Sequence, residues 1–274
     1  MKKFSIFQLP VLSFYSSQLY QDVGLNWKGV GLGYLFLLLA ICTIPKMFKL
    51  HNGLSLFIDR EAPPFIEQIP KITIEKGKVH IDQPQPYYIK APDSNDVVAI
   101  IDTTGQIQSL ENTEAFALLT KTKLIMRQSN AESRTYDLSQ VESFVLDQDK
   151  ITGWLNTVKK IFIPFLYPFV LLGSFIFRSI QALIYAVIGL FFAALCKTKL
   201  SYSALLRLAV VAVTPCIILR TVLEIISIKI PMDGLLFFLI AMAYLFCGVR
   251  VCSMALTTAE DKIHPENQDQ SPNY

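Results

Sequence analysis

Long apolar runs, separated by one stretch in which apolar and polar residues alternate, dominate the pattern of this chain. The run 29–45 has no charged residue and lies between Lys28 and Lys46. As a helix it would be about 25 Å long, enough to cross a bilayer core once. Two later runs, 204–228 and 232–256, are long enough for the same reason and are separated by a short turn. The pattern predicts transmembrane helices at all three.

The apolar run 161–196 is too long for one span. As a single helix it would measure about 54 Å, against roughly 30 Å for a bilayer core. A single helix centred on Arg178 would also bury a guanidinium group, at roughly 3 kcal/mol or more. We therefore expect a helical hairpin, 158–176 and 179–197, with Arg178 at its turn. The total becomes about five spans, or four if the first part of the run lies only in the membrane interface.

The two ends of the chain lie outside these spans. Residues 1–28 begin with Lys2 and Lys3, as signal peptides do, but Pro10, several Ser and Gln residues and the lack of a small-x-small site argue against cleavage. Their aromatic residues favour an interfacial helix, with a helix packed on the bundle as the alternative. The polar residues 257–274 have no apolar period, and we expect a disordered tail.

Residues 46–155, between the first and second spans, contain most of the acidic residues and no cysteine. The segment KITIEKGKVHI alternates on both sides of Lys76 and Gly77, which predicts a two-stranded hairpin. Further strands are expected in PYYIK, VVAIIDTTGQIQSL, KLIMRQ and SRTYDLS. Helices are expected in ENTEAFALLTKT and in SQVESFVLDQDKITGWLNTVKK, which leads into the membrane. The predicted fold class is a membrane all-α helical bundle with an inserted small α+β domain.

Composition supports the membrane class and excludes others. Hydrophobic residues make up 52% of the chain and charged residues only 17%, with a mean hydropathy of +0.42, too apolar for an ordinary soluble domain. The net charge of +3 is scattered, so the basic footprint of a nucleic-acid-binding protein is missing. The five cysteines lie in apolar segments without metal-ligand spacing and are interpreted as small buried hydrophobes. We expect no metal and no cofactor.

The stretch AIIDTTGQIQSL raises the question of an aspartic protease, since Asp102 is followed by Thr-Thr-Gly. That chemistry needs two carboxylates that share a proton, usually from two Asp-Thr/Ser-Gly loops. Here the spacing is one residue longer and no second copy exists. We interpret Asp102 to Gly105 as a turn. GxSxG, HExxH and phosphate-loop patterns are also absent, so we do not expect an enzyme.

Charged residues inside the predicted spans are costly and often functional. Arg220 and Glu224 are four residues apart and could neutralise each other, while Pro215 frees a carbonyl and can kink the helix. In one interpretation this helix lines a transport path or gate. In the other, Arg207 and Glu224 lie near opposite interfaces and Pro215 is a packing kink. The candidate intramembrane residues are Arg178, Arg207, Pro215, Arg220 and Glu224.

An ordered set of segments resembles one known family. The segments are SFYSSQLYQDVGLNWKGVGLGYLFLLL, IPKITIEKGKVHI, VVAIIDTTGQIQSL, LLTKTKLIMRQ, SRTYDLS and LLRLAVVAVTPCIIL. Together they resemble the bacterial membrane family called domain of unknown function 1189, over nearly the whole chain except the tail. The resemblance implies a multi-pass protein distantly related to five-span Yip1-type proteins, and some members are labelled maltodextrin-utilisation proteins. It implies no established reaction and no catalytic residue.

Two functional hypotheses follow. In the first, the protein is a non-enzymatic accessory, scaffold or sensing protein of the bacterial cytoplasmic (inner) membrane, whose α+β domain binds a small ligand or a membrane or envelope protein. In the second, it is a small transporter or channel subunit that uses the helix 204–228. Lys2 and Lys3 favour a cytoplasmic N-terminus and a domain outside the cytoplasm. With five spans, however, Lys197 and Lys199 would also lie outside, a conflict that inversion or the removal of one span would repair.

Overall fold

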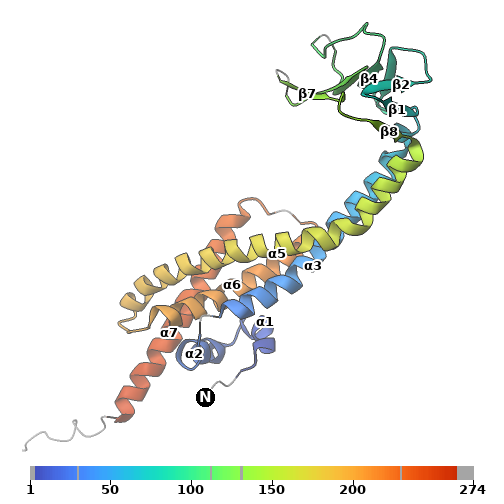
Figure 1. Cartoon of the computed structure of the whole chain (residues 1–274). Coiled ribbons are helices and arrows are strands. Elements are labelled where there is room, and N and C mark those ends of the chain that lie inside the picture. Colours follow the sequence, from blue (N-terminus) through green and yellow to red (C-terminus); the bar gives the residue numbers. More distant parts are fainter. Residues whose placement is uncertain (1–3, 30, 112, 130–131, 229, 264–274) are drawn as a thin grey trace, which may run out of the picture. The chain divides into compact units, whose positions relative to one another are not determined.

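The chain divides into two compact units. Met1–Lys49 and Pro164–Tyr274 form a helical unit, and Leu50–Ile163 form a second unit, the sheet unit, which contains all the strands. Two long helices, α3 (Leu32–Leu56) and α5 (Gln148–Leu195), contribute residues to both units. The computed structural model describes residues 4–29, 31–111, 113–129, 132–228 and 230–263 (Figure 1).

Helix α6 (Tyr202–Ile225) is the central element of the helical unit (Figure 1). Every residue from 204 to 217 is buried, as expected for a helix that is apolar on all sides and surrounded by others. Around it pack α3, α5, α7 (Asp233–Ile263) and the short α2 (Ser17–Leu25).

Side-chain contacts set the helix directions in this unit. Tyr34 Oη donates to Thr214 Oγ1 at 3.2 Å, and Lys49 Nζ donates to Ser227 Oγ at 2.9 Å. Helix α3 therefore runs in the same direction as α6. Helices α5 and α7 are joined to α6 by short connections and run opposite to it.

Four helical segments among the described residues are long and apolar enough to cross a membrane, so the expected count of about five spans is not confirmed. The predicted hairpin of 158–176 and 179–197 is wrong, because α5 is continuous over 48 residues. Between Gly173 and Gln181, where the turn was expected, the chain has no proline and no further glycine to end the helix. Arg178 donates to Gln181, about one helical turn further on, at 2.6 Å. At about 72 Å, α5 exceeds one span because it continues into the sheet unit.

The N-terminal arm, residues 4–29, precedes α3. It contains a 3-10 turn (Ile6–Gln8), α1 (Leu9–Leu12) and α2, whose buried face packs against α6 and α7. At the other end of the chain, residues 257–263 continue α7 and are helical, which contradicts the expected disorder there; residues 264–274 of that prediction lie outside the described residues.

The sheet unit contains two sheets. The smaller has the order β2-β1-β8, and the larger has the order β3-β4-β5-β6-β7. Pairing is antiparallel except between β4 and β5. The strands are β1 (Ile72–Glu75), β2 (Lys78–Ile81), β3 (Tyr87–Lys90), β4 (Val97–Asp102), β5 (Ala117–Thr120), β6 (Lys123–Arg127), β7 (Ser133–Asp137) and β8 (Ser143–Leu146).

The predicted hairpin around Lys76 and Gly77 is confirmed. Both residues have positive φ, 49° and 75°, in the two-residue turn that joins β1 to β2. Glycine is needed at the second position for space as well, since a Cβ on Gly77 would lie 2.6 Å from the Cα of Ser139. The expected strands β3 and β4 and the expected pair β6-β7 are also present.

Three local predictions in this unit are wrong. The segment expected as a helix around Ala115 to Leu119 contains β5, because pairing with β4 and β6 buries Leu118 completely and outweighs local helical spacing. The segment SFVL forms β8 on the edge of β1, so the helix that follows begins only at Gln148. After the Asp102 turn, residues 107–110 form no strand; they cover the larger sheet instead.

Candidate functional site

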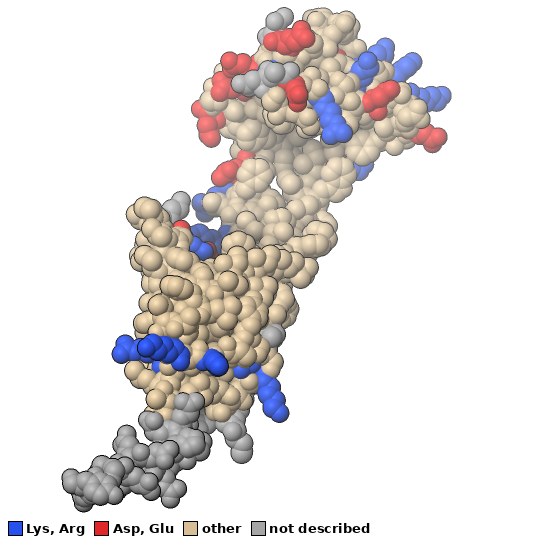
Figure 2. All heavy atoms as spheres, turned by 90° about the vertical axis from the view of Figure 1, so that its left-hand side faces the viewer, with Lys and Arg blue, Asp and Glu red and all other residues tan. Residues whose placement is uncertain are grey.

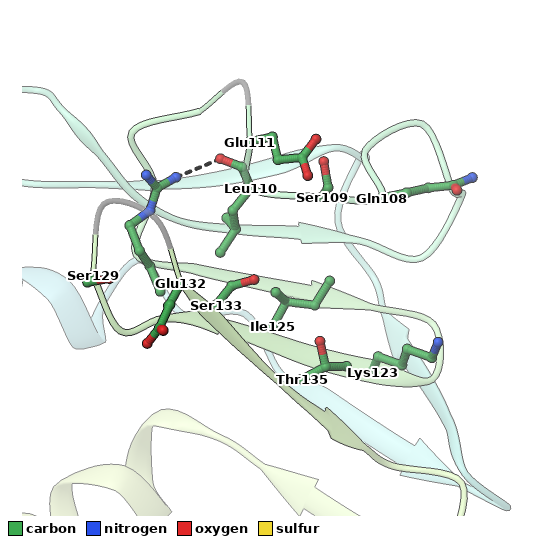
Figure 3. Close-up of a pocket in the computed structure, with 11 residues that line it drawn as sticks. Gln108, Ser109, Leu110, Glu111, Lys123, Ile125, Ser129, Glu132, Ser133 and Thr135 are labelled. Carbon is green, nitrogen blue, oxygen red and sulfur yellow. Dashed lines mark hydrogen bonds between the residues drawn. The ribbon is translucent and has the colours of Figure 1, made fainter.

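The sheet unit carries a hollow of about 480 Å³, called the trough here, between residues 108–111 and the strands β6 and β7 (Figure 3). Its volume is in the range of small-molecule sites. In Figure 3, Leu110 and Ile125 point toward each other across the trough, with the hydroxyl groups of Ser133 and Thr135 beside them. The lining residues are Gln108, Ser109, Leu110, Glu111, Lys123, Ile125, Arg127, Ser129, Glu132, Ser133 and Thr135.

Asp102 builds the turn that leads the chain over the sheet. Its buried carboxylate accepts hydrogen bonds from the Thr104 backbone N–H at 2.8 Å, from the Thr104 hydroxyl at 2.6 Å and from the Ile107 N–H. Burial alone would raise the pKa of Asp102, but these hydrogen bonds outweigh it and hold the pKa below its ordinary value. The interpretation of Asp102 to Gly105 as a turn is therefore confirmed.

Arg127 holds the loop that forms the upper wall of the trough. Its guanidinium donates to the Leu110 carbonyl at 2.6 Å, the bond drawn in Figure 3. It also donates to the Thr113 carbonyl and, through Nε, to the Ala115 carbonyl at 3.2 Å. Such a fork fixes the loop at several points. The role of Arg127 is not predictable from the sequence, where it is a lone arginine at the end of an alternating strand. Because its guanidinium binds these loop carbonyls, Arg127 stabilises the wall of the trough.

The side chains that line the trough are mainly polar. Lys123, Glu111 and Glu132 place charges of both signs at its rim, and the interior offers hydroxyl and amide groups. Neither His nor Cys is among its described lining residues, so a nucleophile paired with an imidazole base is not available there. Strand β7, which lines one side of the trough, is the edge strand of the sheet and is exposed along all five residues. This arrangement can hold a ligand by several hydrogen bonds.

Arg207, one of the predicted intramembrane residues, is buried near the start of α6. It donates through Nε to the Val23 carbonyl at 3.0 Å, through Nη2 to the Gly24 carbonyl at 3.1 Å and through Nη1 to the Gly29 carbonyl at 2.9 Å. Two of these carbonyls lie at the C-terminal end of α2, where the helix dipole favours a cation. Arg207 therefore fastens the N-terminal arm to α6.

Arg220 and Glu224 do not form the pair that the sequence suggested. Arg220 bonds Asp233, at the start of α7, at 2.5 Å, and its guanidinium carbon lies 5.1 Å from the centre of the Phe237 ring. An arginine N-terminal to a glutamate is the less favourable order for an i,i+4 pair, whereas an aspartate in the first turn of a helix is favourable. These side chains line a cavity of about 310 Å³ that also includes Leu223 and Glu224.

Arg178 and Pro215 have local roles. Arg178 donates to Gln181, which donates in turn to the Tyr185 hydroxyl at 2.7 Å, so the three form a chain along α5. Pro215 lies within the buried part of α6, where Thr214 donates to the carbonyl of Val210 at 3.0 Å. The five predicted residues do not form one site, since Arg207 and Arg220 are about 20 Å apart along α6.

Metal chemistry has no support within the part of the chain that the structure describes. No group of three or more His, Cys, Asp and Glu side chains there could hold a metal ion. Of the five cysteines, Cys216 and Cys252 are buried, while Cys247 is exposed, so the prediction that all five are buried is only partly confirmed.

These features define a class: proteins with four apolar helices long enough to span a membrane and an inserted unit of two small sheets. The chain belongs to the family described as protein of unknown function (DUF1189), whose model matches residues 7–249. This confirms the resemblance. An uncharacterised protein of Rickettsia prowazekii (strain Madrid E) is 24% identical over 237 residues, which cover 78% of this chain and 82% of that protein. No solved structure matches the chain.

Proposed function

We propose that this protein is a four-span protein of the bacterial cytoplasmic membrane that holds its sheet unit outside the cytoplasm as a binding domain. The proposed ligand is a polar small molecule or a polar segment of an envelope protein, bound in the trough. The role is accessory, scaffolding or sensing, without catalysis. The observation that carries the proposal is the hollow of about 480 Å³, lined by hydrogen-bonding groups and held in shape by Arg127.

The surface of the helical unit supports a place in the membrane. Large apolar side chains are exposed along the outer faces of its helices, among them Phe169 at 61%, Phe191 at 63% and Leu239 at 56%. A soluble monomer rarely leaves apolar surface of this extent in water, whereas hydrocarbon chains cover it without penalty.

The exposed basic residues at one end of the helical unit support the orientation. Lys28, Lys197, Lys199 and Arg250 are exposed at the end where α3 begins and α5 ends, and Figure 2 shows Lys and Arg side chains in a row there. With four spans, both chain ends lie on that side, and a cytoplasmic location satisfies the positive-inside tendency. The conflict that five spans created is removed, because the α5–α6 connection now shares the side of the N-terminus.

Cysteine accessibility tests the orientation. In a cysteine-free parent, Ser94→Cys in the sheet unit should react with an impermeant maleimide in intact cells, because it faces outward. Thr198→Cys, in the α5–α6 connection, should react only after lysis and serves as the matched control. Labelling of Thr198→Cys alone in intact cells would overturn the orientation.

Photocross-linking tests the trough. Benzoylphenylalanine at position 108, at the rim, should give a discrete adduct in cells, detected by intact mass. Thr135→Arg fills the floor of the trough and should abolish that adduct at unchanged protein level. The same photoprobe at Tyr88, which is 44% exposed on β3 at the opposite edge of the sheet, is the control. An adduct at position 108 that persists with Thr135→Arg, or that is equal at Tyr88, would contradict binding in the trough.

The helical contacts favour this accessory role over a transporter. Arg207 is engaged by three carbonyls and Arg220 by Asp233, and both therefore have packing roles. The buried residues 204–217 of α6 are in contact with neighbouring helices rather than with a channel lumen.

A further inference from the structure

The two faces of the N-terminal arm differ in their exposure. Its inner face is buried, with Leu9 and Leu19 fully covered by the bundle. Its outer face is exposed and apolar, with Phe7 at 80% and Tyr15 at 72% exposure. Residues 4–21 carry no charge, so the exposed face has no ionic group to keep it in water. The exposed large apolar residues of the arm are Ile6, Phe7, Val11, Phe14 and Tyr15.

The three bonds from Arg207 hold the arm on α6, and contacts within the arm fix its own conformation. Besides the three bonds from Arg207, Asp22 accepts from Trp27 Nε1 at 2.9 Å and from the Asn26 side chain at 2.8 Å. Tyr20 donates to the Ser13 carbonyl at 2.8 Å, which ties α2 to the end of α1. The outer face is therefore presented in one fixed orientation.

The arm contacts α7 at Tyr244, which lies nearer to the start of that helix than the basic residue Arg250. Tyr244 Oη donates to the Phe14 carbonyl at 3.1 Å, and Tyr244 lies six residues before the exposed Arg250 on α7, about 9 Å along the helix. Amphipathic helices at membrane surfaces place their apolar face at a similar depth, roughly 5–10 Å below the headgroups.

The basic side chains lie at the depth where headgroups would be. Lys197 and Lys199 follow the end of α5, and Ser253 on α7 donates to the Cys196 carbonyl at 3.0 Å, which brings Arg250 near the same end. The acidic residues Glu224 and Asp233 lie at the opposite end of the helical unit, near the end of α6 and at the start of α7. A cationic row next to an apolar face matches an anionic lipid.

We propose that the outer face of the N-terminal arm is a lipid-binding surface that inserts into the cytoplasmic leaflet and selects phospholipids with anionic headgroups through Lys197, Lys199 and Arg250. This inference rests on the proposed membrane placement. It adds a partner, the anionic lipid, at the end of the helical unit where α3 begins.

Photocross-linking in native membranes tests the insertion. Benzoylphenylalanine at Phe7 should give adducts with the mass of one phospholipid, as should the same photoprobe at Ile180, which is 53% exposed on α5. Position 94 in the sheet unit should give none. A lipid adduct at Ile180 without one at Phe7 would overturn the arm proposal alone, whereas none at either position would overturn the membrane placement as well. Val11, 63% exposed, replaces Phe7 if that variant is not produced.

Lipid selection is tested with the full chain in nanodiscs of equimolar phosphatidylglycerol and phosphatidylcholine. Adducts at Phe7 should favour phosphatidylglycerol by about threefold or more, since each nearby basic residue attracts anionic lipid. The triple change Lys197→Gln, Lys199→Gln and Arg250→Gln should move the ratio toward that of the bulk lipid, with Lys28 still present at this end. The matched change Lys46→Gln with Lys49→Gln, at the other end, should leave it unchanged. A bulk ratio in the unaltered protein would overturn the selection.

Discussion

Arg207 and Arg220 lie in the same helix, but their positive charges are stabilised by different kinds of partner. Arg207 is buried and uses backbone carbonyls, which carry the partial negative charge of a helix end. Arg220 is partly exposed and uses the carboxylate of Asp233 and the ring of Phe237. Neither guanidinium needs a substrate to stabilise it, which is why we assign both to packing.

A double-mutant cycle distinguishes the pair seen in the structure from the pair suggested by spacing. Arg220→Leu and Asp233→Leu should show a coupling free energy of about 0.5–1.5 kcal/mol in thermal unfolding in detergent, since they share a close ion pair at a half-exposed position. The matched cycle of Arg220→Leu with Glu224→Leu should give a coupling of less than about 0.3 kcal/mol. Equal couplings in both cycles would contradict this assignment.

Asp102 makes the stability of the sheet unit depend on pH. Its folded-state pKa is lowered, so its contribution is fully present above the ordinary pKa of about 4 and is lost as pH falls through the folded-state value. We expect the calorimetric unfolding temperature of the sheet unit to decrease as the pH falls below about 4, and this decrease to be smaller in Asp102→Asn. At pH 7, Asp102→Ala should lower the free energy of unfolding by about 1–3 kcal/mol, because buried donors lose their acceptor. An unchanged acid profile in Asp102→Asn would exclude this role.

At the scale of elements, the arm and α7 approach closely through glycines. A Cβ on Gly248 would lie 2.8 Å from Tyr20 Cδ1, and one on Gly24 would lie 2.5 Å from Cys252 Sγ. No side chain larger than hydrogen fits at either contact without displacement. Small residues at helix contacts of this kind allow close backbone packing in membranes.

Gly248→Ala should therefore loosen α2 from α7. The expected loss is about 1–3 kcal/mol of unfolding free energy, the usual range for overpacking, measured by thermal unfolding in detergent. Gly173→Ala is the matched control, because a Cβ there meets nothing within 4 Å, and it should be neutral or stabilising by up to about 1 kcal/mol through helix propensity. A Gly248→Ala protein as stable as the control variant would show that the contact relaxes freely.

At the scale of the whole molecule, the continuity of α5 decides how many spans the proposed membrane protein has and which parts would share a side of the membrane. Ile180→Cys in a cysteine-free parent lies in the turn that the sequence suggested, and in the continuous helix of the proposed membrane protein it would face hydrocarbon. We expect no reaction with an impermeant maleimide from either side of open membranes. Thr198→Cys, in the α5–α6 connection, should react and serves as the control. Equal reaction at both positions would restore the hairpin and the fifth span.

Features that depend on composition and short-range pattern are predictable from the sequence. The apolar runs located the helices α3, α6 and α7, and the Lys76-Gly77 turn located the β1–β2 hairpin, because hydrophobic length and left-handed turn residues act locally. The ordered segments were also sufficient to indicate the family to which the chain belongs.

Features that depend on partners distant in the chain are visible only once the chain is folded. Leu118 lies in a strand because β4 and β6 pair with it, and Arg220 bonds Asp233 because α7 returns beside α6. Arg127 could not be assigned to the trough from sequence, since its acceptors lie 12 to 17 residues away in a loop without a recognisable motif. Local propensity differs by about 1 kcal/mol or less between states, so pairing and burial between remote segments outweigh it.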